Sequence, residues 1–289
     1  MKTGFIGAGK VGCSLGKYLS TKGIDVAGYH DQDRKAAEEA AKFTETKVYA
    51  DPEELIADCD VLFLTVPDGL IPHVFEEISD GNIQDKLICH CSGSISSAEA
   101  FPGAPEKGAF RYSVHPLFAV SDRFTTYREL ADAFFTMEGD PERIEEMEAL
   151  LAKAGLRFKV IPPEEKRRYH LAAAIVSNLV LALVDTGLKE LEVCGFGAEE
   201  AREAVTPLAE GNLRHALADG PARALTGPVE RGDTETLRKH LACLDKEEDR
   251  ELYRLLSYKL LALAREKNPD RDYSEMEKFL KDASAGTLH

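Results

Sequence analysis

The sequence predicts an α/β protein in which an N-terminal doubly wound sheet is followed by an all-helical C-terminal domain. The first strand, which begins at Thr3, runs directly into a Gly-x-Gly-x-x-Gly motif that spans Gly7 to Gly12. Short apolar runs that end in polar turns recur up to residue 161, whereas helical spacing dominates from residue 164 onward. Pro162 and Pro163 separate the two patterns. We therefore predict domains over residues 1–162 and 163–289.

Composition excludes several classes of partner. The 289 residues suit two domains, and 44% hydrophobic with 30% charged residues is ordinary for a soluble globular protein. The net charge of −15, from 36 Lys and Arg against 51 Asp and Glu, repels nucleic acid and anionic membranes. We expect neither a nucleic acid nor a membrane as partner.

The N-terminus and the cysteines indicate a cytoplasmic protein. The chain enters a strand by residue 3 and lacks the zones of a secretory signal. Six cysteines are scattered without a disulfide framework, and Cys89-His90-Cys91 has no second ligand pair, so we expect no metal site. The apolar run 171–184 is too short to span a bilayer of about 30 Å and predicts a buried helix.

The glycine motif predicts a Rossmann-type dinucleotide-binding fold. It is followed by a helix over Val11–Lys22 and a strand over Ile24–Tyr29, which gives the order strand, helix, strand. Gly7 allows a tight turn, Gly9 lets the backbone approach a pyrophosphate, and Gly12 lets the helix pack closely. The free N–H groups of the helix N-terminus then face the phosphates. The alternative is an ordinary glycine-rich turn.

An acidic residue supports the cofactor assignment. Asp31 ends the second strand, close to the spacing of about 20 residues at which a carboxylate binds the adenosine ribose. Asp31 repels a 2′-phosphate, whereas Arg34 could reach one, so the cofactor is NADP or NAD. The predicted cofactor-binding residues are Gly7, Ala8, Gly9, Lys10, Val11, Gly12, Asp31, Arg34, Val66, Pro67 and Ser92.

Later strands bring further polar turns to the edge where such sheets bind ligands. Continuous apolar runs over Val61–Val66, Leu87–His90 and Phe110–Val114 are typical of strands in a buried parallel sheet. Two more strands are predicted over 133–137 and 157–161. Helices are predicted over 33–42, from 51, and over 141–154, 164–191, 198–219, 233–242 and 246–267.

The turns after these strands carry Asp68, His90, Ser92 and His115, near the expected position of the nicotinamide. Each has a structural alternative: Ser92 can satisfy turn amides, and His115 precedes a proline in an extended dipeptide. The question of function or structure stays open for all four.

The helix that opens the second domain carries polar groups on one apolar face. Steps of three and four residues align Lys166, His170 and Ser177, with Asn178 beside them. Hydride transfer to C=O or C=N requires positioned proton or hydrogen-bond donors. The alternative is structural hydrogen bonding within the helix or to a neighbouring one. The predicted catalytic residues are Lys166, His170, Ser177, Asn178 and His115.

A loop punctuated by glycine and proline, from Leu225 to Asp233, is the third candidate. Thr226 and Arg231 could bind a substrate carboxylate, since arginine offers paired N–H groups. Arg231 could instead pair with Glu230 or Asp233. Asp233 itself is predicted to cap the following helix.

These motifs together resemble a known family. Gly7–Gly12, Val66-Pro67-Asp68, His90–Gly93, His115–Phe118, Tyr169-His170…Ser177-Asn178, and Thr226–Asp233 through His240-Leu241 occur in that order. They resemble the bacterial Rossmann-like oxidoreductases with a C-terminal domain of unknown function 2520, over residues 3 to 262. That family is similar to 6-phosphogluconate dehydrogenase-like proteins, including ketopantoate reductase, pyrroline-5-carboxylate reductase and prephenate dehydrogenase.

The resemblance implies an NAD(P) fold followed by a helical substrate and dimerisation domain, without a named substrate. Lys166 and Asn178 echo the Lys…Asn arrangement of hydroxyacid dehydrogenase relatives at a different spacing. Family members often carry Ser-Arg after the second strand, whereas this chain has Asp31-Gln32, which weakens the expectation of NADP.

The leading functional expectation is an NAD(P)-dependent oxidoreductase acting on a small carboxylate-bearing carbonyl, alcohol or imine, with ketopantoate-like 2-oxo acids as one class. His115-Pro-Leu-Phe118 prompts a prephenate or arogenate dehydrogenase-like alternative, because those enzymes contain a similar His-Pro-Met-Phe stretch. A dinucleotide-binding sensor or regulatory protein without chemistry is the second alternative. The apolar helix further predicts a homodimer through the second domain.

Overall fold

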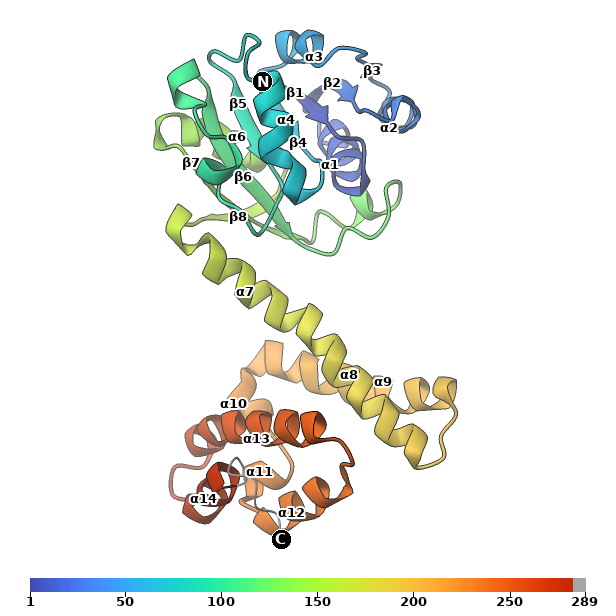
Figure 1. Ribbon diagram of the computed structural model, residues 1–289, viewed down its shortest axis with the longest axis vertical. Helices are drawn as coiled ribbons and strands as arrows, with labels where there is room; N and C mark the ends of the chain where they lie inside the picture. Colours follow the sequence, from blue (N-terminus) through green and yellow to red (C-terminus); the bar gives the residue numbers. More distant parts are fainter. Residues whose placement is uncertain (283–289) are drawn as a thin grey trace. The chain divides into compact units, whose positions relative to one another are not determined.

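The computed structural model describes residues 1–282, and its N-terminal part is built on one eight-stranded sheet (Figure 1). The order across the sheet is β3-β2-β1-β4-β5-β6-β7-β8. β7 runs antiparallel to β6, and every other neighbouring pair is parallel. The order reverses between β1 and β4, which is where doubly wound sheets bind their ligands. The strands are β1 (Lys2–Ile6), β2 (Asp25–His30), β3 (Lys47–Val48), β4 (Val61–Leu64), β5 (Leu87–His90), β6 (Phe110–Leu117), β7 (Phe134–Gly139) and β8 (Arg157–Val160).

Helices cover both faces of this sheet, because alternate strand residues point to opposite sides. In β4, Val61 and Phe63 pack in one apolar cluster with α1, α2 and α6, whereas Leu62 and Leu64 pack in another with α3, α4 and α5. The doubly wound α/β fold is therefore confirmed. These helices are α1 (Lys10–Thr21), α2 (Arg34–Thr44), α3 (Pro52–Asp58), α4 (Ile71–Ile78), α5 (Ser97–Ala100) and α6 (Ile144–Lys153).

The C-terminal part is helical throughout residues 178–282, as predicted. Its core is formed by Leu237, Leu241, Leu261, Met276 and Leu280, all at most 2% exposed. Its helices are α8 (Asn178–Val193), α9 (Ala198–Asp219), α10 (Pro221–Ala224), α11 (Pro228–Arg231), α12 (Thr234–Cys243), α13 (Glu247–Lys267) and α14 (Ser274–Asp282).

The chain divides into two compact units, Met1–Ser177 and Asn178–His289. The helix α7 (Lys166–Val176) belongs to the first unit, so its contacts with the sheet lie within one unit. The boundary predicted at residues 162 and 163 falls just before the short 3₁₀ turn Pro163–Glu165 that leads into α7.

Several features differ from the sequence prediction. The helix predicted over 164–191 is divided at Ser177 into α7 and α8, and α4 and α14 were not predicted. The two-residue strand β3 was not predicted, because its side chains are exposed and give no apolar run. The apolar segment 171–184 is not buried within the single chain: Val176 and Leu181 are 70% and 67% exposed. By length and composition, the helical stretch Pro163–Val193 could cross a membrane. Core helices of soluble proteins can pass the same test, so length and composition alone do not make this stretch a membrane span.

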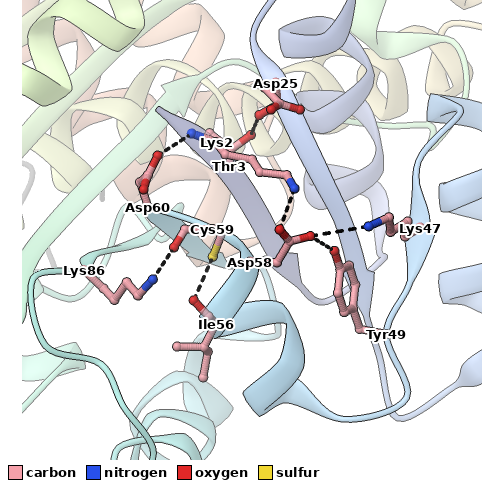
Figure 2. Close-up of polar contacts among 10 residues, drawn as sticks. All are labelled: Lys2, Thr3, Asp25, Lys47, Tyr49, Ile56, Asp58, Cys59, Asp60 and Lys86. Atoms are coloured by element: carbon pink, nitrogen blue, oxygen red, sulfur yellow. Dashed lines mark hydrogen bonds and ion pairs between the residues drawn. The ribbon is translucent and has the colours of Figure 1, made fainter.

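The amino end of the sheet is held by a polar network around Asp58, at the end of α3 (Figure 2). Its carboxylate accepts a hydrogen bond from Lys2 Nζ at 2.7 Å and another from the Tyr49 hydroxyl, and Lys47 Nζ lies 3.7 Å away. Hydrogen bonds from Lys2 and Tyr49 lower the pKa of Asp58 to about 2. The network thus joins β1, β3 and α3 at the end opposite the candidate site.

Candidate functional site

A cavity of about 270 Å³ lies at the carboxyl ends of β1, β2 and β4, at the reversal of strand order. Five of the predicted cofactor residues line it: Gly7, Gly9, Asp31, Val66 and Pro67. The dinucleotide motif and the acidic residue are therefore brought together, as their spacing suggested.

The glycines of the motif have geometry that larger residues would obstruct. Gly7 has a φ of +103°, a region that favours glycine. A Cβ on Gly12 would lie 2.3 Å from both the Gly7 carbonyl oxygen and Thr65 Oγ1. The helix α1 follows Gly9 without a side-chain cap and contains Lys10 and Val11 in its first turn, so its first N–H groups are available to an anion.

Asp31 is fixed against the glycine loop. Its Oδ2 accepts a hydrogen bond from the Ala8 amide at 2.6 Å, and its Oδ1 accepts one from the Asp33 amide at 2.8 Å. Arg34 points elsewhere: its side chain is 78% exposed and its Nε donates to Glu38 at 3.0 Å. The Asp31 carboxylate therefore lines the cavity, and the Arg34 guanidinium does not.

A hydrogen-bonded turn continues this edge from the cavity toward β6. Asp68, which follows Pro67, accepts hydrogen bonds from Ser92 Oγ at 2.6 Å and Ser94 Oγ at 2.9 Å. Ser92 N donates to His90 Nδ1 at 3.1 Å. Burial lowers the pKa of His90 to about 3, so its imidazole is neutral and holds the turn.

Two histidines meet beyond this turn. His115 on β6 and His170 on α7 have ring centroids 6.5 Å apart, and both lie against Gly93. A Cβ on Gly93 would lie 2.8 Å from His115 Nε2 and 2.8 Å from His170 Cδ2. On its other side, His115 Nδ1 lies 2.8 Å from the Tyr169 hydroxyl.

Lys166 lies beneath this group and is only 1% exposed. Its Nζ donates a hydrogen bond to Ser113 Oγ, two residues before His115 on β6. Burial lowers the pKa of Lys166 to about 8, an effect that the buried Glu138 opposes. Burial, followed by the charge of Lys166, lowers the pKa of His115 to about 4. Lys166 therefore acts on His115 through its charge.

The predicted residues thus fall into two sets. His115, His170, Lys166 and Ser92 share one edge of the first unit. Of the others, Ser177 is exposed and donates a hydrogen bond from its Oγ to Ala173 O at 2.8 Å, and Asn178 begins the second unit. Thr226 and Arg231 are also exposed residues of that second unit.

In the Leu225–Asp233 loop, the structure shows the helix cap that was predicted for Asp233. Asp233 caps α12 by accepting a hydrogen bond from the Thr236 amide at 3.0 Å. Glu230 binds Asn268 and Arg271, and within residues 1–282 Arg231 forms no ion pair with either acid. The Arg231 side chain is exposed, and its charge helps to lower the pKa of Asp233.

Four residues of the site had no role assigned from the sequence: Ser113 and Thr65, and also Tyr169 and Gly93, which occur in the motifs. The two-residue period of β6 places Ser113 and His115 on one face, which was a usable signal. The partners Tyr169 and Lys166 required the packing of α7 on the sheet. Among the described residues no cluster of three or more His, Cys, Asp or Glu could hold a metal ion.

Fold and cavity together define a dinucleotide-binding protein of Rossmann type. Residues 2–92 match the family described as NADP oxidoreductase, coenzyme F420-dependent, and residues 133–260 match the domain of unknown function DUF2520. The chain therefore joins an oxidoreductase-type Rossmann domain to a DUF2520 domain, which confirms the resemblance seen in its motifs.

Solved structures show the same fold over nearly the whole chain. Protein TM1727 from Thermotoga maritima is 25% identical, with 92% of this chain and 99% of that chain covered and a TM-score of 0.72. An imine reductase from Myxococcus stipitatus in complex with NADP+ is 15% identical, with coverages of 92% and 93% and a TM-score of 0.62. A reductive aminase from Aspergillus terreus, in complex with NADPH and ethyl-5-oxohexanoate, is 17% identical, with coverages of 96% and 98% and a TM-score of 0.62.

Proposed function

We propose that this protein is an NAD(P)-dependent oxidoreductase that transfers hydride to or from a small carbonyl, alcohol or imine that carries a carboxylate. The observation that supports this most directly is the continuous edge that links the glycine-loop cavity, through Asp68 and Ser92, to His115 and His170. A dinucleotide site and a group of imidazoles are thereby adjacent within one unit.

The first unit fits a dinucleotide. A Cβ on Gly7 or Gly12 would overlap protein atoms, and Gly9 lines the cavity. The α1 N-terminus offers N–H groups without a side-chain cap to a pyrophosphate, and Asp31 suits the ribose hydroxyls. Because the Asp31 carboxylate would repel a 2′-phosphate and Arg34 points away, we further propose that NAD(H) is preferred over NADP(H).

A bound reduced nicotinamide would supply hydride to the electrophilic carbon. The oxygen or nitrogen of the reacting double bond then gains negative charge and takes up one proton. His115 and His170 can place N–H groups at that atom, where a hydrogen bond strengthens as the charge develops. Burial, followed by the charge of Lys166, keeps the imidazole of His115 neutral, and Gly93 gives the rings room.

For binding of the carboxylate we propose the residues predicted from the sequence, Thr226 and Arg231. Arg231 is exposed and forms no ion pair within the described chain, and an arginine binds a carboxylate through two parallel N–H groups. Thr226, Ser177 and Asn178 are the further candidates for orienting the substrate. The names of the structural relatives support including C=N among the reacting bonds.

The experiment is an assay of NADH and NADPH oxidation with a panel of 2-oxo acids, prephenate, cyclic imines carrying a carboxylate, and 2-oxo acids mixed with amines. We expect turnover with one carboxylate-bearing class and loss of it in His115→Ala. Turnover of prephenate alone would favour the dehydrogenase alternative. Tight cofactor binding without oxidation by any compound would overturn the enzymatic proposal and favour a sensor.

We also propose a cytoplasmic homodimer. All six cysteines are free, which suits a reducing compartment. The apolar side chains of α8 and α9 include Leu181, Val193, Leu208 and Leu217, each more than 60% exposed in the single chain. A second copy covering them would remove an apolar surface that monomeric proteins rarely expose.

A further inference from the structure

The two ring nitrogens of His115 have different surroundings. Nδ1 lies 2.8 Å from the Tyr169 hydroxyl. Nε2 forms no hydrogen bond with residues 1–282 and lies against Gly93, 2.8 Å from where a Cβ on Gly93 would be. One nitrogen is therefore committed to the Tyr169 hydroxyl, and the other has no partner within the described chain.

The charges around the ring keep it neutral. His115 is faced by Lys166 and His170 from α7, and by Asp68 from the turn after β4. Burial and then Lys166 lower the pKa of His115 to about 4, against the opposing effect of Asp68. Burial also raises the pKa of Tyr169, so the phenol keeps its proton. At neutral pH the pair holds one phenolic proton and one ring proton.

The position of those protons follows from the available acceptors. The Thr136 hydroxyl, on the β7 residue paired with His115, hydrogen-bonds to the phenol and lowers the pKa of Tyr169, as a donor to the phenol oxygen does. The phenolic proton consequently has His115 Nδ1 as its acceptor. The ring proton must then reside on Nε2.

We propose that Tyr169 is a positioning residue that donates its phenolic proton to His115 Nδ1 and thereby makes Nε2–H a hydrogen-bond donor to the reacting oxygen or nitrogen. The catalytic part of this inference rests on the proposed function. The opposite tautomer would present an Nε2 lone pair, which is a general base and not a donor. Tyr169 thus decides which of the two roles His115 has.

The first test needs no substrate. In protein labelled with ¹⁵N-histidine, with His115 assigned by comparison with His115→Gln, we expect the ring proton on Nε2 at neutral pH. In Tyr169→Phe, loss of the donated bond should change the Nδ1 resonance and raise the titration midpoint by about one pH unit. Tyr127→Phe, which removes a remote hydroxyl, should change neither. A proton on Nδ1, a charged ring, or an unaltered spectrum in Tyr169→Phe would overturn the proposal.

The second test uses the panel compound that is turned over fastest with NADH. Removing a donor at the reacting atom should lower kcat about 100-fold in His115→Ala. His115→Gln should retain most of the wild-type kcat, because its amide keeps an N–H near the Nε2 position. Tyr169→Phe should lower kcat about tenfold without changing NADH affinity, and should have no effect in the His115→Gln background.

Equal inactivity of the Gln and Ala variants would exclude the donor role. If no panel compound is turned over, the proposed function fails, whereas the NMR result still decides whether Tyr169 sets the tautomer.

Discussion

At the residue scale, the candidate site depends on a glycine that lies against two imidazoles. Gly93 follows Ser92 in the turn that reaches from Asp68 toward β6, and both rings are within contact of the space a side chain would occupy. The turn therefore has no room for a side chain at Gly93, and an added Cβ must displace one of the two rings.

We expect Gly93→Ala to lower turnover at least tenfold and to leave NADH affinity unchanged, because the new Cβ would lie 2.8 Å from His115 Nε2. Gly69→Ala is the matched control, since a Cβ at Gly69 would meet nothing within 4 Å. Steady-state kinetics with calorimetric NADH titration measures both quantities. Normal turnover in Gly93→Ala would show that the ring positions do not matter.

Cofactor choice is also set at a single residue. In Asp31→Ser, removal of the carboxylate should shift the ratio of NADPH to NADH affinity by at least about tenfold toward NADPH. The loss of its hydrogen bond to the Ala8 amide should weaken NADH binding at the same time. An unchanged ratio in calorimetric titrations would mean that Asp31 does not face the 2′ position.

At the scale of elements, the buried strands could be predicted from the sequence, whereas the exposed strand β3 and the antiparallel direction of β7 could not. β4 and β5 are buried on both faces, and their apolar runs are evident in the sequence. β3 has only Lys47 and Val48, both exposed, and the antiparallel direction of β7 leaves no trace in its composition. The contacts of α7 with β6 depend on tertiary packing, which is why the partner of His115 was missed.

The Asp58 network predicts an acid-sensitive contribution at the amino end of the sheet. The pKa of Asp58 is lowered from 3.8 to about 2, so its stabilisation is present above pH 4 and is lost as pH falls toward 2. Because the side chain is 36% exposed, we expect Asp58→Asn to lower the free energy of unfolding by only about 1 kcal/mol at neutral pH.

Denaturant unfolding at several pH values measures this contribution. The difference between wild type and Asp58→Asn should shrink between pH 4 and 2, and Asp132→Asn, at an exposed position with no ion pair in the described chain, should show no such difference. A difference that stays constant down to pH 2 would assign the effect to something other than the ionised carboxylate.

At the scale of the whole molecule, residues 171–184 are helical as predicted apart from the break at Ser177, but their predicted burial in one chain is wrong. Periodicity shows that a helix is apolar and cannot show what covers it. Leu179 and Leu181 are 57% and 67% exposed, and a second copy is the occupant that we propose.

Light scattering should give the mass of a dimer for the wild type. Leu179→Asp should shift it toward the monomer, since a charge in an apolar interface is costly. Val48→Asp, an equivalent change on the exposed strand β3, should leave the mass unchanged. A monomeric wild type would contradict the proposed assembly.

The central claim is that the edge from the glycine loop to His115 is the site of a nicotinamide oxidoreductase. Calorimetric titration of the folded protein with NADH tests it most directly. We predict saturable binding of one NADH per chain, greatly weakened by Gly12→Val, because a Cβ there would overlap the Gly7 carbonyl oxygen. Absence of binding by both NADH and NADPH would contradict the account.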